Sequence, residues 1–359
     1  MGRKRYNIRI NIISFPPRMF KSQSSFQSSF FGSFAYQGIL SRHQDHFLVR
    51  LLSAVDFSFV KEAAEECYSN MGRPAYDPVI MMKLLLLQTL YDLSERDVVE
   101  QADTNILFRA FIGLSLDDAI PHWTLLGKFR ERLGEERFEE IFNRVVMLAK
   151  KVGLLDEKLR ILDSTAVKAK VDVCRHVGKQ GDDDDDSPTR LDDRSPDPEA
   201  RTGHKSAHVK WYGYKEHVSI DPASDIITAV ITTPANVSDV IPSVDLIDKE
   251  RMFFKDEMRP IRQVTGDKGY VGRSTEFKER NILDYTIPRD NMRPKTGTWY
   301  RSAKKQRPKI ERIFAEAKTN HHLGKCRYWT RWKTHIQGLI TFLAMNLKRI
   351  TNFLQPAMV

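Results

Sequence analysis

The sequence predicts an α/β protein in which a mixed sheet with flanking helices follows an all-α N-terminal domain. Apolar side chains recur at helical spacing through residues 37–153. From residue 154 the pattern changes to short β-type runs that alternate with helices, in the order β-β-β-α-β-α-β-α. A chain of 359 residues is long enough to form both parts around a sizeable core. We therefore expect a helical domain at 37–153 and an α/β domain at 154–354.

Residues 1–36 differ in composition from both domains. The stretch KSQSSFQSSFFGS is rich in Ser, Gln and Phe, a low-complexity composition that is typical of a poorly ordered tail. Pro16 and Pro17 follow the basic N-terminus too soon for the apolar segment of a signal peptide. We expect a tail that contributes little to the fold; the alternative is that its phenylalanines dock on a partner.

The cysteines and the apolar runs indicate the compartment. The three cysteines are far apart and form no CxxC pair, which favours a reducing cytoplasm and no disulfide framework. No apolar run reaches the roughly 18 residues that a membrane span requires. We therefore expect a cytoplasmic protein without a membrane partner.

One segment of the helical domain is apolar on every side. Asp77 and Pro78 open this run, VIMMKLLLLQTLYDL, which predicts a buried core helix. Ser94 is a good N-cap for a helix over 95–114, and further helices are expected at 124–134 and 135–154. Small helical modules of this kind bind DNA, form dimers or act as scaffolds, and the pattern leaves these alternatives open.

The first predicted strand carries an acid in its centre. LRILDSTAVKAK, residues 159–170, is a β-type run with Asp163 between apolar neighbours. A buried strand tolerates a carboxylate poorly unless the carboxylate is paired, caps the chain or binds a metal ion. The simpler alternative is that Asp163 caps a turn with Ser164 or Thr165.

Residues 172–209 interrupt the α/β pattern. The segment includes five consecutive aspartates at 182–186 and few apolar side chains, so it predicts a solvated acidic loop. It lacks the spaced ligands and the glycine of a calcium loop, and its histidines do not have zinc spacing.

The remaining segments complete the α/β domain. The runs 211–221 and 225–239 predict an antiparallel pair, and a helix capped by Ser238 is expected to follow over 238–254. A short strand then ends at Asp267, where two flanking glycines allow a sharp turn that exposes the carboxylate. A fifth strand is expected at 283–290. The apolar helix at 334–354 is expected to pack across the sheet.

The segment RPKIERIFAEAK, residues 307–318, predicts a helix that begins at Pro308. One stripe of this helix is apolar. Arg307, Glu311 and Lys318 are four and seven residues apart, so they share a different stripe. An ordinary solvated salt-bridge face has the same pattern.

Three acids on separate elements suit one particular chemistry. Phosphodiester cleavage by in-line attack benefits from two Mg²⁺ ions about 3.5–4 Å apart. Mg²⁺ prefers oxygen ligands and keeps several waters, so two or three carboxylates are sufficient. We therefore expect Asp163, Asp267 and Glu311 to converge on one catalytic metal site.

The charge distribution points to a polyanionic partner. The net charge is +10, and residues 289–333 contain fourteen Lys or Arg but only three Asp or Glu. Such a basic segment indicates DNA, with an acidic membrane surface as the alternative. The predicted DNA-binding residues are Arg307, Lys318, Lys304, Lys305, Lys309 and Arg312.

Taken together, these motifs resemble the DDE transposases of bacterial insertion sequences, in the group close to insertion-sequence families four and five. The resemblance covers roughly residues 36–353. It rests on LDSTAVKAK with Asp163, on YGYKEHVSID followed by TTPANVSD, and on VTGDKGY with Asp267. The family signature Tyr-x2-Arg-x3-Glu-x6-Lys is matched from Arg307 to Lys318, except that Lys304 stands at the tyrosine position.

This resemblance implies a ribonuclease-H-like catalytic core with Mg²⁺ or Mn²⁺ as cofactor. It implies double-stranded DNA as substrate, both the terminal inverted repeats of a transposon and the target DNA. It also implies a homo-oligomer, at least a dimer in the synaptic complex, that acts at the nucleoid. The alternatives are a structure-specific nuclease on the same core and a catalytically silent DNA-binding regulator.

Overall fold

The computed structural model describes residues 30–69, 74–155, 158–172, 195–206, 209–254 and 261–355. The aspartate run at 182–186 and most of the predicted tail therefore lie outside the described residues. Helix α1 (Phe30–Arg42) begins within the predicted tail, so the helical region starts earlier than residue 37. The physical reason lies in Tyr36, which is buried and donates its hydroxyl hydrogen bond to the carbonyl of Leu114, tying α1 to the helices that follow.

The N-terminal half is helical, as predicted, and its helix ends follow local capping signals. Ser94 caps α5 in a capping box with Asp97. The predicted helix over 95–114 is broken at Asn105, whose side chain accepts hydrogen bonds from the first turn of α6. The two predicted helices over 124–154 form α7, with a kink at Gly134, where φ is 65°. After α1, the elements of this half are α2 (Phe47–Ala54), α3 (Ser58–Ala64), η1 (Glu65–Cys67), α4 (Pro78–Leu90), α5 (Glu95–Thr104), α6 (Ile106–Ile112) and α7 (Thr124–Lys151).

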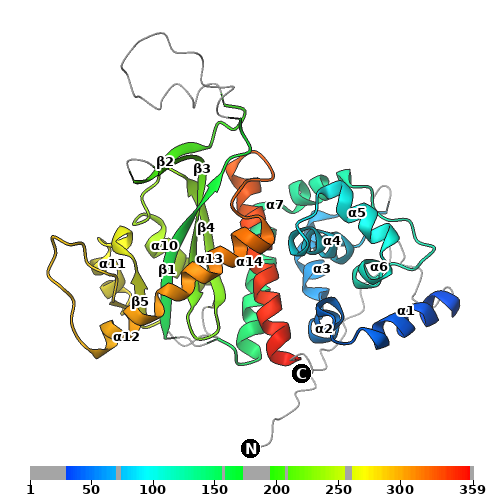
Figure 1. Ribbon diagram of the computed structural model, residues 1–359, viewed down its shortest axis with the longest axis horizontal. Coiled ribbons are helices and arrows are strands. Elements are labelled where there is room, and N and C mark those ends of the chain that lie inside the picture. The colour runs from blue at the N-terminus through cyan, green and yellow to red at the C-terminus, as the bar shows by residue number, and fades with distance from the viewer. Residues whose placement is uncertain are drawn as a thin grey trace, which may run out of the picture.

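A mixed sheet forms the centre of the C-terminal half (Figure 1). Strand β3 lies between β1 and β4 and is antiparallel to both, which confirms the predicted antiparallel pair. Strands β1, β5 and β6 are parallel to one another. The order β4-β3-β1-β5-β6 confirms the predicted ribonuclease-H-like arrangement. The strands are β1 (Leu159–Lys168), β2 (Arg201–Ser206), β3 (Val209–Asp221), β4 (Ile226–Pro234), β5 (Gln263–Gly266) and β6 (Leu283–Asp284).

Four details of the C-terminal half differ from the sequence prediction. Strand β2 lies inside the predicted acidic loop, where it pairs with the start of β3. Helix α10 (Pro242–Phe254) begins at Pro242 rather than Ser238, because proline suits the first helical position and residues 238–241 form a turn. Strand β6 is only two residues long, although the chain stays hydrogen-bonded beside β5 as far as Ile287. A helix not predicted, α12 (Thr298–Gln306), precedes α13 (Pro308–His321).

The sheet is covered on both faces. Helices α10 and α11 (Ser274–Glu279) pack on one face, around Leu162, Val264 and Phe277. Helices α13 and α14 (Arg331–Leu354) cover the other face, which confirms that the C-terminal helix crosses the sheet. Because α14 also packs against α7, α4 and α2, the helical half and the sheet share one continuous hydrophobic core. No helix among the described residues is long and apolar enough to cross a membrane.

Candidate active site

Asp163 lies in the middle of β1, on the sheet face that α13 covers. Successive side chains of a strand point to opposite faces. Ile161 and Val167 belong to the core under α13 and α14, and Asp163 has the same parity as these residues. Its side chain is nearly buried, and its Oδ1 accepts a hydrogen bond from the backbone N–H of Ser164 at 2.8 Å.

Asp267 follows the last residue of β5, as the sequence predicted. Its Oδ1 accepts a hydrogen bond from the N–H of Gly269 at 2.8 Å, which caps a short 3₁₀ turn, η2 (Lys268–Tyr270). Leu162 and Gly266 are partners in the parallel β1–β5 pairing. The next residue on each strand is therefore one of the two aspartates, so they emerge side by side.

Glu311 lies in the first turn of α13, and Arg307 stands immediately before that helix. The apolar stripe of α13 is buried as predicted, by Ile310, Ile313, Phe314 and Ala317. Because the apolar face of α13 packs on the core, the helix face that carries Arg307 and Glu311 is directed toward the end of the sheet.

The Arg307 guanidinium contacts all three acids. Its Nη2 lies 3.4 Å from Asp163 Oδ2 and 3.9 Å from Asp267 Oδ2, and its Nη1 lies 2.9 Å from Glu311 Oε1. The structure thus brings together three residues that are separated by more than forty positions in sequence. In the described residues, however, none of the three belongs to a group of three ligand-type side chains whose ligand atoms are all within 4.8 Å of one another.

The environment of Asp163 favours the presence of a cation. Burial raises the pKa of its carboxyl to about 7, the Ser164 N–H and Arg307 lower it, and the nearby charges of Asp267 and Asp239 raise it. Carboxylate oxygens are the ligands that Mg²⁺ and Mn²⁺ prefer. Several acids around one positive group are therefore a donor set that fits a divalent metal ion.

Asp239 is a further acid of this region that the sequence analysis did not identify. It precedes α10, and its Oδ1 accepts hydrogen bonds from Ser164 Oγ at 3.1 Å and Lys215 Nζ at 2.9 Å. It ends the stretch TTPANVSD, which carried part of the family resemblance. That stretch was the sequence signal from which Asp239 could have been identified, but the resemblance did not assign a role to this aspartate.

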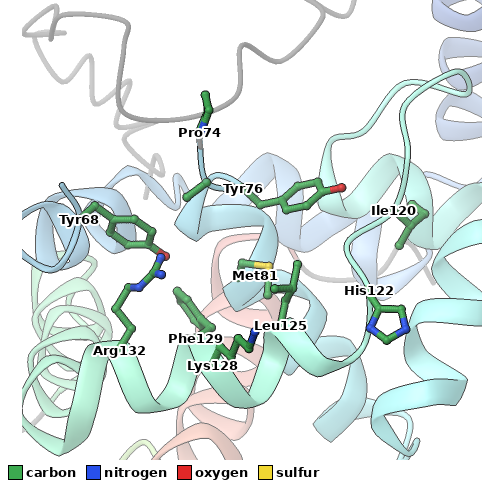
Figure 2. A pocket seen from close by; sticks show the side chains of 11 residues that line it. Tyr68, Pro74, Tyr76, Met81, Ile120, His122, Leu125, Lys128, Phe129 and Arg132 are labelled. Carbon is green, nitrogen blue, oxygen red and sulfur yellow. The ribbon is translucent and has the colours of Figure 1, made fainter. Parts of the chain in front are cut away.

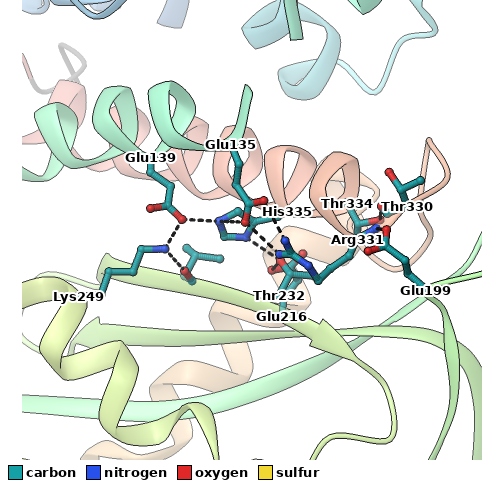
Figure 3. Close-up of polar contacts among 11 residues, drawn as sticks. Glu135, Glu139, Glu199, Glu216, Thr232, Lys249, Thr330, Arg331, Thr334 and His335 are labelled. Atoms are coloured by element: carbon teal, nitrogen blue, oxygen red, sulfur yellow. Dashed lines mark hydrogen bonds and ion pairs between the residues drawn. The ribbon is translucent and has the colours of Figure 1, made fainter. Parts of the chain in front are cut away.

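A second cluster has the residue types of a metal site but is already neutralised. Glu135, Glu139 and His335 offer ligand atoms within 4.8 Å of one another. Figure 3 shows that Lys249 pairs with Glu139 and that Arg331 reaches this acidic group. Arg331 lies 3.0 Å from Glu135, and His335 lies 2.9 Å from Glu139. Because two cations satisfy two carboxylates, we interpret this cluster as an ion-pair network that joins α7 to α14 and α10.

A pocket of about 410 Å³ lies in the helical half, between the start of α4 and α7. Its lining combines aromatic and basic side chains, including Tyr68, Tyr76, Lys128 and Arg132 (Figure 2). None of the predicted site residues lines it. The pocket is therefore separate from the three acids.

Four of the six predicted DNA-binding residues divide into two pairs. Lys304 and Lys305 are exposed on α12, and their side chains have no hydrogen bond or ion pair with another described residue. Lys309 instead donates to the carbonyl of Pro222, and Arg312 lies 3.7 Å from Asp225. These last two cations are therefore directed to the β3–β4 turn.

Lys318 is exposed at the other end of α13, where the structure adds cations that lie outside the predicted basic segment. Burial of part of its side chain and the neighbouring charges of Lys205 and Lys168 lower its pKa. Trp329 is 51% exposed, and its indole N–H donates to the carbonyl of Lys170, two residues beyond Lys168. Several other cations of residues 289–333 instead form ion pairs with acids of the helical half, namely Arg327 with Asp92, Arg331 with Glu135 and Lys333 with Glu131.

Two known families match this chain. The family described as "Transposase DDE domain" matches residues 155–347, more than half of the chain. The family described as "Transposase domain (DUF772)" matches residues 38–132, which lie in the helical half. The DDE transposase family implies DNA as the substrate and dependence on a divalent metal ion. The chain therefore belongs to the DDE transposases of the insertion-sequence type, enzymes that cleave DNA and transfer its strands.

Proposed function

We propose that Asp163, Asp267 and Glu311 are the catalytic acids of this transposase and that together they hold two Mg²⁺ ions, with Mn²⁺ as a substitute. The observation that carries this proposal is the Arg307 guanidinium, which contacts all three carboxylates. A positive group among acids from three elements occupies a place suited to metal cations. When bound, such ions activate the attacking oxygen and stabilise the leaving oxygen of a phosphodiester.

The protein's own residues position the DNA for this chemistry. Arg307 presents a planar guanidinium that suits bidentate contact with a phosphate, and in this proposal it turns from the acids to the scissile phosphate when metal and DNA bind. Lys318 lies on the same helix, and Lys304 and Lys305 lie on the preceding one. We propose that these cations hold the DNA backbone on either side of the acids.

The proposed substrate is the pair of terminal inverted repeats of a mobile element, and the proposed acceptor is target DNA. The 3′-OH freed at the element end attacks the target strand. One protomer contains one set of acids, so action on both ends in one complex calls for at least two protomers. We propose a homodimer or larger assembly in this synaptic complex, acting at the nucleoid because chromosomal DNA is its substrate.

A nicking and strand-transfer assay tests this proposal. The purified chain is incubated with DNA that carries the element ends and with a target plasmid, either with Mg²⁺ or with EDTA. We expect nicked ends and joined products with Mg²⁺ and neither product with EDTA. Cleavage that persists in EDTA would contradict the metal site, and nicking without joining would support the nuclease alternative.

The DNA surface is testable separately, through the salt dependence of binding. Replacing Lys168, Lys205 and Lys318 together with Gln should weaken binding to all DNA sequences. For every phosphate that the protein no longer neutralises, the slope of log K against log salt should become flatter by about 0.9. Gel shifts at several salt concentrations measure this slope.

A matched control is available on the other side of the sheet. Lys278 is exposed on α11, which packs on the face opposite α13. Lys278→Gln should leave the salt slope unchanged. A triple variant with the wild-type slope would show that the DNA does not contact the end of α13 that carries Lys318.

A further inference from the structure

The spacing between Asp163 and Asp267 is not fixed by the sheet itself. The parallel pairing of β1 with β5 covers Leu159–Leu162 and Gln263–Gly266 and stops one residue before both aspartates. Beyond that point β1 continues beside β3, whereas the other chain turns into η2. Contacts outside this ladder therefore contribute to the distance between the two carboxylates, and Arg307 supplies one of them from the α13 side.

Asp239 is hydrogen-bonded to one of the elements that diverge here and lies close to the other. On the β1 side, its Oδ1 accepts from Ser164 Oγ at 3.1 Å, and Ser164 in turn gives its backbone N–H to Asp163. On the β5 side, its Oδ2 faces the turn after Asp267. A Cβ on Gly269 would lie 3.3 Å from Asp239 Oδ2 and 3.0 Å from Asp267 Oδ1.

Lys215 fixes Asp239 in this position. Its Nζ donates to Asp239 Oδ1 and to the carbonyl of Val237, both at 2.9 Å, so it clamps the turn before α10 onto β3. Only 13% of the Lys215 side chain is exposed. Because a largely buried charge keeps its partner in place, the pair forms a rigid support on the side of the strands opposite to Arg307.

We propose that Asp239, held by Lys215, is a positioning residue that sets the separation of Asp163 and Asp267 for binding of a divalent cation. The inference rests on the proposed function of those two aspartates. It assigns a role to three motif residues, Ser164, Lys215 and Asp239. Partners of metal ligands typically contribute 10–100-fold to metal affinity or activity.

The Mn²⁺ dissociation constant, measured by calorimetric titration of the full chain, tests this role. Ser164→Ala removes one hydroxyl and leaves all charges in place. We expect it to weaken Mn²⁺ binding by roughly 10–100-fold. Ser164→Thr keeps the hydroxyl and should retain wild-type affinity. Asp239→Ala should weaken Mn²⁺ binding at least as much as Ser164→Ala.

A double variant separates positioning from a simple effect of charge. If Asp239 acts through Ser164, Asp239→Ala combined with Ser164→Ala should bind Mn²⁺ no more weakly than Asp239→Ala alone. Gel shifts without metal should show unchanged DNA binding, because none of these residues belongs to the proposed DNA surface. Asp245→Asn, an exposed acid on α10, is the matched control and should behave as wild type.

The outcomes distinguish this inference from the proposed function. Wild-type Mn²⁺ affinity in Asp163→Asn would overturn the proposed metal site itself. Loss of Mn²⁺ binding in Asp163→Asn, together with wild-type affinity in Ser164→Ala, would overturn only the positioning role. If Asp239→Ala fails to fold, the comparison of Ser164→Ala with Ser164→Thr still decides.

Discussion

Glu311→Gln should lower DNA cleavage by several orders of magnitude while leaving DNA binding at least as strong as in wild type. The substitution keeps the size of the side chain and its place in the first turn of α13, but removes the charge that would hold a metal ion. It also removes repulsion between this acid, whose side chain is 60% exposed, and the phosphate backbone. A gel shift and a nicking assay with Mg²⁺ measure the two effects.

Glu316→Gln provides the same substitution on the same helix. Glu316 pairs with Lys348 and Arg349 of α14 rather than with Arg307. Its replacement should cost at most about 1 kcal/mol of stability, as is typical of partly exposed ion pairs, and should leave cleavage nearly normal. If Glu316→Gln abolished cleavage while Glu311→Gln did not, the alignment of the family signature on this helix would be wrong.

Arg307→Gln should change metal binding and cleavage in opposite directions. Without DNA, the guanidinium neutralises the same three carboxylates that are proposed to bind metal, so its removal should strengthen Mn²⁺ binding several-fold. In the presence of DNA, the scissile phosphate would no longer be held by the guanidinium, which should lower cleavage by about 10²-fold or more. Calorimetric titration and single-turnover cleavage measure the two quantities.

Arg144→Gln is a suitable control for this second experiment. Arg144 is an exposed residue of α7 that pairs with Glu140. The control should leave both quantities at wild-type values. Weaker Mn²⁺ binding in Arg307→Gln would show that the arginine supports the carboxylates in the metal-bound state, contrary to our proposal.

The elements that carry the three acids could be predicted from the sequence because their signals are local. The stripe of Ile310, Ile313, Phe314 and Ala317 specifies a helix with one buried face. Asp163 lies inside the apolar run of β1, and Asp267 lies between two glycines after β5. At neither position does a carboxylate contribute to packing. The family motifs then named the same three residues.

Several features could not be predicted because they depend on contacts between distant segments. Strand β2 has no apolar alternation and exists because β3 offers it a pairing edge, so its sequence, RTGHKS, gave no sign of a strand. The basic segment at 289–333 indicated that the partner is negatively charged. The sequence could not show which cations of this segment pair with acids of the helical half.

By itself, then, the sequence determined the fold class, the chemistry of the site and the three acids proposed to perform it. Periodicity and motif spacing are properties of the linear sequence, so they can be recognised without a three-dimensional structure. Only the tertiary structure decided that Arg307 lies among those acids, that Asp239 is hydrogen-bonded to Ser164 beside the turn after Asp267, and that Lys168 and Lys205 lie near Lys318. Each of these facts is a distance between residues far apart in sequence, and such distances are set by how the sheet and helices pack.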